Sequence, residues 1–316
     1  MASVPLSAIL LAYNRPDFLP RMLDSVLKQQ MRAFELILID NGSTDGRTPE
    51  VCRRFAEKDG RIRLLTMPEN HGPAPARNLG IDSAGGEFIL QLDDDDYCEP
   101  DHFSRLYDLI RQYDADVAIS GCGDEVNGER RIKYQYDGIH VWNREEAVSE
   151  FLKREKFHTA PATKLYRASV YQGIRYVPGK IIDDTHVTYR LMANVRSAVA
   201  HGKPTYWFRK FGGNTTAFLD QNILWPELLD EYLVMQKDRV KYISERVPQE
   251  AAHVRYAAWS YMISMVEKIH QGQGPGCEAQ LETMVRTLRQ NAEEFLNAKW
   301  LTPREQRLMD AHVLER

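Results

Sequence analysis

Short apolar segments alternate with segments of helical spacing over the first hundred residues. Four such segments end in turn-forming residues, so buried strands are expected at 6–11, 34–39, 61–66 and 88–92. Between them, apolar residues recur at helical spacing over 19–27, 51–58 and 76–83. This alternation predicts a parallel sheet with helices on its faces. The expected fold class is α/β, with a mixed, mainly parallel sheet and a Rossmann-like first half.

Beyond residue 100 the pattern becomes more varied and then purely helical. The expected elements are a helix at 101–113, a strand at 117–120, a loop or hairpin at 121–137, a helix at 143–152, extended segments at 163–166 and 199–208, and a helix at 184–192 between them. After about residue 217 only helical spacing remains, at 224–247, 250–271 and 277–299. The sequence therefore predicts an α/β domain over 1–216 and a helical region over 217–316.

Composition narrows the class of protein. Hydrophobic residues make up 43% and charged residues 27%, which is typical of a soluble globular chain. The formal net charge of -4 argues against a nucleic-acid partner, since a basic excess would be expected there. Four scattered cysteines without a CxxC pair favour free thiols in a reducing cytoplasm. No signal peptide and no apolar stretch of about 20 residues is evident, so we expect a cytoplasmic protein, at most peripheral to a membrane.

The run Asp93–Asp94–Asp95–Asp96 follows the strand expected at 88–92. Adjacent carboxylates repel one another, and a strand end presents alternate residues on one side. Asp93 and Asp95 are therefore expected to converge on one ion, while Asp94 faces away or reaches a ribose. Hard oxygen ligands suit Mg²⁺ or Mn²⁺. An acidic, solvent-exposed turn is the alternative, and the spacing of an EF-hand is missing.

Two further loops carry candidate chemistry. Asp40, in the loop 40–45 after a strand, could accept hydrogen bonds from a uracil imide or a ribose hydroxyl; a capped turn without a ligand is the alternative. Arg77, in the segment 72–78, opens a helix, where free amides and a forked guanidinium favour phosphate; a surface arginine is the alternative. Because ligands bind beyond the carboxyl ends of parallel strands, both loops should face one crevice together with Tyr13 and Asn14.

Four segments in this order resemble the family 2 glycosyltransferases with the GT-A fold. They are Ala12–Tyr13–Asn14, 40–45, 72–78 and 92–96, and the similarity covers roughly residues 4–215. The resemblance implies a catalytic domain over 1–216, with a nucleotide-sugar-binding half at 1–98 and an acceptor half at 99–216. It also implies a nucleotide-sugar donor, and a UDP-sugar is expected.

The resemblance also assigns roles to single residues. Positions that hold the nucleotide base and ribose match Ala12, Tyr13 and Asp40, with Asn14 close by, and Arg77 matches a position near the nucleotide and diphosphate. The segment Asp93–Asp94–Asp95 is similar to the DxD motif, with Asp95 as the first candidate for a direct ligand of Mn²⁺ or Mg²⁺. Asn41 departs from the commoner Asp, which removes one charge near the nucleotide.

The segment 179–184 is similar to the Glu-Asp segment of the same family, with Asp183 in place of Glu. The resemblance makes Asp184 the base that deprotonates the acceptor hydroxyl, and Asp183 either orients the acceptor or shares the proton. Helix capping by the two aspartates is the alternative. The segment 206–215 is similar to the one that ends the catalytic domain, where Arg209 and Lys210 would bring positive charge to the diphosphate; solvated cations are the alternative.

These assignments predict an inverting glycosyltransferase that acts on a hydroxyl acceptor, a glycan or a lipid-linked oligosaccharide at the inner face of a membrane. The C-terminal helices are expected to carry a homodimer contact or a membrane-proximal face. A sugar nucleotidyltransferase is disfavoured, because its Gly-rich phosphate loop is replaced by Tyr13–Asn14–Arg15–Pro16. A catalytically inactive nucleotide-sugar binder is the remaining alternative. Neither His71 nor His201 is expected to bind the metal.

Overall fold

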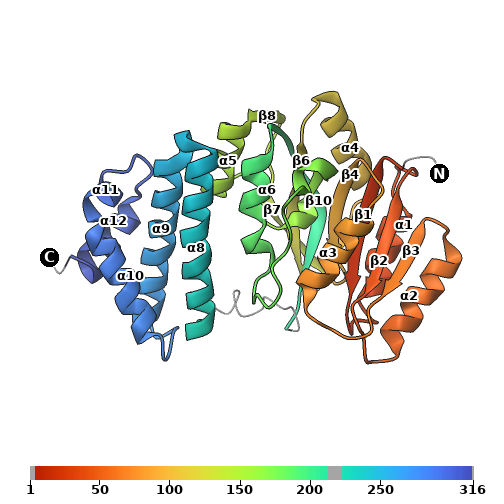
Figure 1. Ribbon diagram of the computed structural model, residues 1–316, viewed down its shortest axis with the longest axis horizontal. Coiled ribbons are helices and arrows are strands. Elements are labelled where there is room, and N and C mark those ends of the chain that lie inside the picture. The colour runs from red at the N-terminus through yellow and green to blue at the C-terminus, as the bar shows by residue number, and fades with distance from the viewer. Residues whose placement is uncertain (1–3, 213–222, 315–316) are drawn as a thin grey trace. The chain divides into compact units, whose positions relative to one another are not determined.

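The computed structural model describes residues 4–212 and 223–314, and the ribbon is shown in Figure 1. The chain divides into two compact units, Met1–Asn214 and Thr215–Arg316. The first unit is built around one sheet, and among its described residues the strands are β1 (Leu6–Ala12), β2 (Glu35–Asp40), β3 (Ile62–Thr66), β4 (Phe88–Asp93), β5 (Tyr97–Cys98), β6 (Val117–Val126), β7 (Glu129–Tyr134), β8 (Ile139–Asn143), β9 (Lys164–Arg167) and β10 (Ser197–Lys210).

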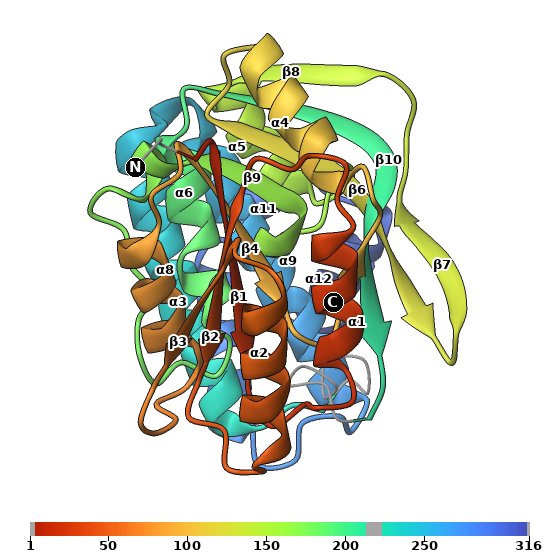
Figure 2. The same ribbon diagram turned by 90° about the vertical axis from the view of Figure 1, so that its right-hand side faces the viewer.

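The sheet is mixed, and its strand order is β3-β2-β1-β4-β9-β6-β10-β5. Strands β1 to β4 pair only in parallel with one another, because each connection between them is a helical crossover. Strand β9 enters antiparallel between β4 and β6, and β10 runs parallel to β6. β7 pairs with β6 at the edge of the unit, where the hairpin projects in Figure 2, and β8 pairs with β10.

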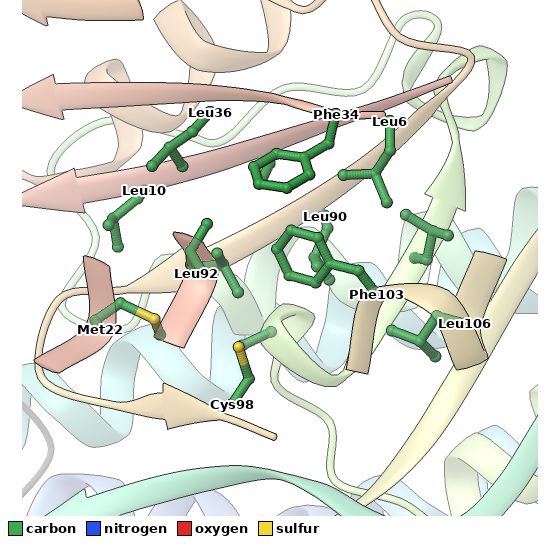
Figure 3. Close-up of a cluster of buried hydrophobic side chains, with 14 of the residues drawn as sticks. Leu6, Leu10, Met22, Phe34, Leu36, Leu90, Leu92, Cys98, Phe103 and Leu106 are labelled. Carbon is green, nitrogen blue, oxygen red and sulfur yellow. The ribbon is translucent and has the colours of Figure 1, made fainter. Parts of the chain in front are cut away.

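Helices cover both faces of this sheet. They are α1 (Leu19–Leu27), α2 (Arg47–Lys58), α3 (Pro73–Ser83), α4 (His102–Gln112), α5 (Arg144–Lys153) and α6 (Thr188–Asn194), with short 3-10 turns η1 (Pro161–Thr163), η2 (Ala168–Tyr171) and η3 (Asp184–His186). The main core lies where alternate residues of β1, β2 and β4 meet α1, α2 and α4, as Leu10, Leu36 and Leu90 do with Met22 and Phe103 (Figure 3). Helix α3 packs against β1 and β2 through Gly80, where a Cβ would lie 2.4 Å from Ile9.

Most of the expected elements are present, with corrected bounds. The segment at 121–137 is the β6–β7 hairpin, and β5 and β8 are two short strands that the apolar pattern did not indicate. Helix α3 begins at Pro73, not at residue 76, since proline is tolerated in the first turn. Helix α1 has Phe18 at its N-cap without a side-chain bond, and the preceding Asp17 pairs with Arg47.

The second unit is helical in its described part. Its elements are α8 (Pro226–Arg246), η4 (Pro248–Glu250), α9 (Ala251–His270), α10 (Glu278–Gln290), α11 (Ala292–Leu296) and α12 (Pro303–His312). The expected helix at 277–299 is two helices, and α12 was not expected although Thr302 forms a capping box with Glu305. All four cysteines are buried and free, as predicted. Within 4–212 and 223–314, no helix combines the length and the apolar character that a membrane span requires.

Candidate active site

Strand register brings three of the four sequence segments to one edge of the sheet. Ala12 lies opposite Asp40 in the β1–β2 pair, and Leu11 lies opposite Asp93 in the β1–β4 pair. The strands are parallel, so the residues that follow them meet at the same edge. Asp40 is buried at the end of β2 and accepts a hydrogen bond from Ser43 N (3.1 Å). Tyr13 is 41% exposed at this edge, which leaves its ring available to a ligand.

The side chains of two asparagines form hydrogen bonds between the loops at this edge. Asn14, which has a φ of +48°, accepts hydrogen bonds from the backbone N–H groups of Thr44 (2.9 Å) and Asp45 (3.2 Å). The Asn41 side chain donates to Gly72 O (3.1 Å), the carbonyl just before α3. A carboxylate could not donate this bond, so Asn41 fixes one loop to another in addition to removing a charge.

The aspartate run leaves β4 at Asp93 and continues as a turn. Asp94 accepts from Tyr13 N (3.0 Å) and from Arg15 (2.8 Å), and Arg15 also pairs with Asp95 (2.9 Å). Burial raises the pKa of Asp94 to about 6, against the opposing charge of Arg15. Strand β4 ends at Asp93, so the alternation of side chains along a strand does not extend to Asp95. Asp93 pairs with Arg77, whereas Asp95 pairs with Arg15.

Asp96, the last residue of the acidic run, bonds to strand β10. It is buried and accepts hydrogen bonds from the Tyr206 hydroxyl (2.9 Å) and from Arg209 N (3.0 Å), both on β10. Burial, with Asp95 and Asp93 nearby, raises the pKa of Asp96 well above its usual range. The Arg209 Nε donates to Asp95 O (2.6 Å), so β10 contacts the acidic turn at two successive residues.

Arg77 joins two motifs that are far apart in the chain. From α3, its Nε donates to Asp183 (2.9 Å), its Nη2 to Asp93 (2.9 Å) and its Nη1 to Gln91 (3.2 Å). The side chain is almost entirely buried, and the two carboxylates outweigh the cost of burial and raise its pKa. The alternative of a surface arginine is therefore excluded. The guanidinium fork bonds to carboxylates of β4 and of the segment before η3.

The neighbouring residues Asp183 and Asp184 have different surroundings, because Arg77 binds Asp183 but not Asp184. Asp183 makes no side-chain capping bond at η3, which excludes capping as its role. Asp184 is partly buried, and burial, followed by the charge of Asp183, raises its pKa to about 6. A carboxylate with such a pKa is ionised at neutral pH and basic enough to accept a proton.

The donor set at the acidic turn suits a hard divalent cation that also binds the ligand. Within 4–212 and 223–314, no cluster of three or more His, Cys, Asp or Glu side chains is placed to hold a metal by itself. Mg²⁺ is commonly bound by one or two carboxylates together with substrate phosphates. Asp93 and Asp95 are donors of this type, and Asp95 already pairs with a cation, the Arg15 guanidinium.

The sequence did not single out three residues that shape this site: Arg15, Gln91 and Tyr206. Arg15 lies two residues after Tyr13, in a loop that was expected to face the ligand, so its place in the sequence could have indicated a role in the site. Tyr206 lies 110 residues from Asp96, and nothing local in the sequence links them. Both histidines expected to be unimportant lie elsewhere: His71 is exposed beside Glu69, and His201 is buried on β10 near Asp101 and Lys203.

Comparison with known proteins agrees with this arrangement. The model of the family described as Glycosyl transferase family 2 matches residues 7–175, more than half of the chain. The chain belongs to glycosyl transferase family 2. The glycosyltransferase GlyG of Streptococcus pneumoniae is 28% identical over 217 residues, 66% of this chain and 72% of GlyG. GlyA of the same organism is 27% identical over 215 residues, 65% of this chain but only 30% of GlyA.

Solved structures of glycosyltransferases share the fold of this chain. S. aureus TarS 1–349, in complex with UDP-GlcNAc, superposes with a TM-score of 0.71 and 18% identity over 96% of this chain and 83% of that one. The mannosyltransferase PcManGT from Pyrobaculum calidifontis, in complex with GDP-Man and Mn²⁺, gives a TM-score of 0.52 at 16% identity, over 97% of this chain and 78% of that one. The predicted GT-A fold and family 2 resemblance are thus confirmed.

Proposed function

We propose that this protein transfers a sugar from a nucleotide-sugar, a UDP-sugar, to a hydroxyl acceptor with inversion at the anomeric carbon. The observation that carries the proposal is the convergence of Asp40, Asp93 and Arg77 at one sheet edge, with Asp184 joined to them through Asp183. The UDP-GlcNAc complex of TarS and the GDP-Man complex of PcManGT support a nucleotide-sugar donor.

The ends of β1 and β2 hold the nucleotide. Tyr13 presents an exposed ring, Ala12 lines the strand end, and Asp40 offers a carboxylate to the base or the ribose. Asn14 keeps the two loops together through its bonds to 44 and 45. Asp94 accepts from Tyr13 N, so it orders the nucleotide loop and reaches the ribose from the acidic turn.

The diphosphate lies beside the acidic turn. Asp93 and Asp95 would hold Mn²⁺ or Mg²⁺, with Asp95 as the direct ligand, and such an ion would supply positive charge to a departing diphosphate. Arg209, bonded to Asp95 O, and Lys210 after it bring further positive charge to this side. Arg77 serves the same region as a positioning residue, because it sets Asp93 and Asp183 at a fixed separation.

Asp184 acts as the base. It accepts the proton of the acceptor hydroxyl while that oxygen attacks the anomeric carbon, and a single displacement inverts the configuration. Asp183 is held by Arg77 and orients the segment that carries Asp184. The acceptor is a glycan or a lipid-linked oligosaccharide, a proposal supported by the similarity to proteins of polysaccharide assembly such as the succinoglycan biosynthesis protein ExoO of Rhizobium meliloti.

The test is a panel of UDP-sugars and GDP-mannose, scored for slow donor hydrolysis with Mn²⁺, Mg²⁺ or EDTA. We expect metal-dependent release of UDP from one donor. The Asp184→Asn variant should lower sugar transfer by about 10²- to 10⁴-fold while donor binding persists. Binding of UDP without turnover of any donor by the wild-type protein would favour an inactive binder instead. Full activity of Asp184→Asn would move the base elsewhere.

A further inference from the structure

His158 and four cationic side chains form a cluster in the first unit, although the chain as a whole is acidic. Lys133 lies on β7, Arg154 ends α5, Lys164 begins β9 and Lys210 ends β10. Burial and the charges of these four side chains together lower the pKa of His158 well below its usual range. We call these five residues the His158 cluster. Because of this lowered pKa, the His158 ring is neutral at physiological pH.

The His158 ring has one unused donor. Its Nδ1 accepts a hydrogen bond from Ala160 N (3.0 Å), so in the neutral ring the proton is on Nε2. Among the described residues no acceptor is bonded to that Nε2–H. The ring is flanked by Phe208 (centroids 4.8 Å apart) and Tyr134 (6.1 Å), both partly exposed. A donor with aromatic neighbours and cations around it is suited to an anion.

The cations of the cluster are only partly neutralised. Lys164 is buried, and its Nζ lies within hydrogen-bond distance of three neutral oxygens, those of His158 O (2.5 Å), Ala160 O (2.8 Å) and Thr163 Oγ1 (3.2 Å). Burial lowers the pKa of Lys164 to about 7, so the surface charge comes from the other basic side chains. Lys133 is 3.6 Å from Asp124, at the far limit of an ion pair. In the part of the chain that the structure describes, the exposed Arg154 guanidinium has no carboxylate partner. Positive potential therefore remains at this surface.

Two connections place the cluster beside the candidate active site. Lys164 is close enough to Asp184 to stabilise its charged form, although burial of Asp184 has the larger, opposite effect. Phe208 contacts Tyr206 (5.0 Å), and the Tyr206 hydroxyl donates to Asp96 in the acidic turn. The buried Lys164 therefore connects the cluster to the segment that carries the proposed base, and Phe208 connects it to the strand that contacts the acidic turn.

We propose that the acceptor is an anionic glycan, and that Lys133, Arg154 and the His158 Nε2–H bind its phosphate or carboxylate groups. The proposal rests on the proposed function, since it names the class of acceptor for that same site. A neutral glycan would leave the Arg154 guanidinium and the His158 donor without a charged partner. A flat membrane surface is disfavoured, because the donor is partly buried between two rings, which suits a single sugar chain.

The test uses the whole chain and three oligomers of similar length: a phosphodiester-linked glycerol oligomer, an oligogalacturonate and a neutral dextran. Binding is measured by fluorescence titration at 50 and 200 mM salt. The variant is the pair Lys133→Gln and Arg154→Gln; glutamine keeps the left-handed backbone cost of Arg154, whose φ is +58°. The matched control is Arg53→Gln with Lys58→Gln, which removes two exposed charges from α2.

We expect at least one anionic oligomer to bind about tenfold more tightly than dextran, and the cluster variant to lose roughly that factor. The salt dependence should weaken in the cluster variant and persist in the control. Equal binding of dextran, an unchanged cluster variant, or binding of phosphatidylglycerol vesicles without oligomer binding would overturn the proposal. Donor hydrolysis should be unchanged in every variant; its absence in the wild-type protein would count against the proposed function instead.

Discussion

At the scale of single residues, the site depends on which cation meets which carboxylate. Arg77 engages Asp93 and Asp183, while Arg15 engages Asp94 and Asp95. A nearby guanidinium favours the ionised form of a carboxylate. At Asp94 burial has the larger effect and raises the pKa to about 6 in spite of Arg15. Among the described residues no arginine side chain bonds to Asp184, and burial raises its pKa to about 6. The carboxylate assigned as the base thus differs from Asp93 and Asp183, which both pair with Arg77.

Arg77→Met should lower the free energy of unfolding by about 3 kcal/mol, because it leaves two partly buried carboxylates without their cation. Urea unfolding at pH 7 measures this loss. The exposed Arg53→Met on α2 is the matched control and should change stability by less than about 0.5 kcal/mol. Equal stability of the two variants would show that the Arg77 network contributes nothing to the fold.

Transfer should depend on pH through Asp184. Only the ionised carboxylate accepts a proton, so activity should be constant above pH 7 and fall about tenfold per unit below pH 6. The measurement is a profile of the turnover number from pH 4.5 to 8 with saturating donor. An activity that is unchanged between pH 7 and pH 5 would contradict the assignment of Asp184.

Sequence alone placed the candidate residues but not their partners. Ala12, Asp40 and Asp93 were expected at one edge, because strand ends in a parallel sheet share an edge. The bond from Arg77 to Asp183 spans 106 residues, and no local pattern encodes which carboxylate a buried arginine meets. The roles assigned to Asp95 and Asp184 in catalysis stay predictions.

At the scale of elements, strand β10 contacts the acidic turn that follows β4. Tyr206 and Phe208 lie on one face of this strand, and Tyr206 bonds Asp96 and accepts from Asp93 N (3.4 Å). Arg209 points the other way and still contacts Asp95 O. The extended segment was expected from its apolar pattern, but its neighbours β5 and β8 were not, since strands of two and five residues carry too little periodicity.

Tyr206→Phe should lower the free energy of unfolding by about 1–3 kcal/mol, because it leaves a buried carboxylate short of one donor. It should also loosen the acidic turn and raise the KM for the donor. Thermal unfolding and initial rates measure the two effects. Tyr134→Phe, which removes a hydroxyl bonded at 3.3 Å to Arg154 O, is a milder control. If Tyr206→Phe has the same stability and the same KM for the donor as Tyr134→Phe, then the contact of β10 with the acidic turn does not support the donor site.

At the scale of the whole molecule, the chain combines a mixed sheet unit with a helical unit. The change in sequence pattern near residue 217 indicated the second unit. The fold of this unit does not test whether its helices form a homodimer contact. Its exposed large hydrophobic side chains in the described residues are Ile223 and Val234, and isolated apolar residues are ordinary on a protein surface. The expected homodimer through these helices therefore has no support here, and light scattering of the whole chain tests it.

The most direct test of the central claim is calorimetric titration of UDP into the wild-type protein with Mn²⁺, with EDTA, and into Asp95→Ala with Mn²⁺. The donor site at the ends of β1, β2 and β4 predicts that UDP binds with Mn²⁺, and that both EDTA and Asp95→Ala weaken binding by at least about tenfold. Equal affinity in all three titrations would contradict a metal-dependent nucleotide-sugar site at the acidic turn.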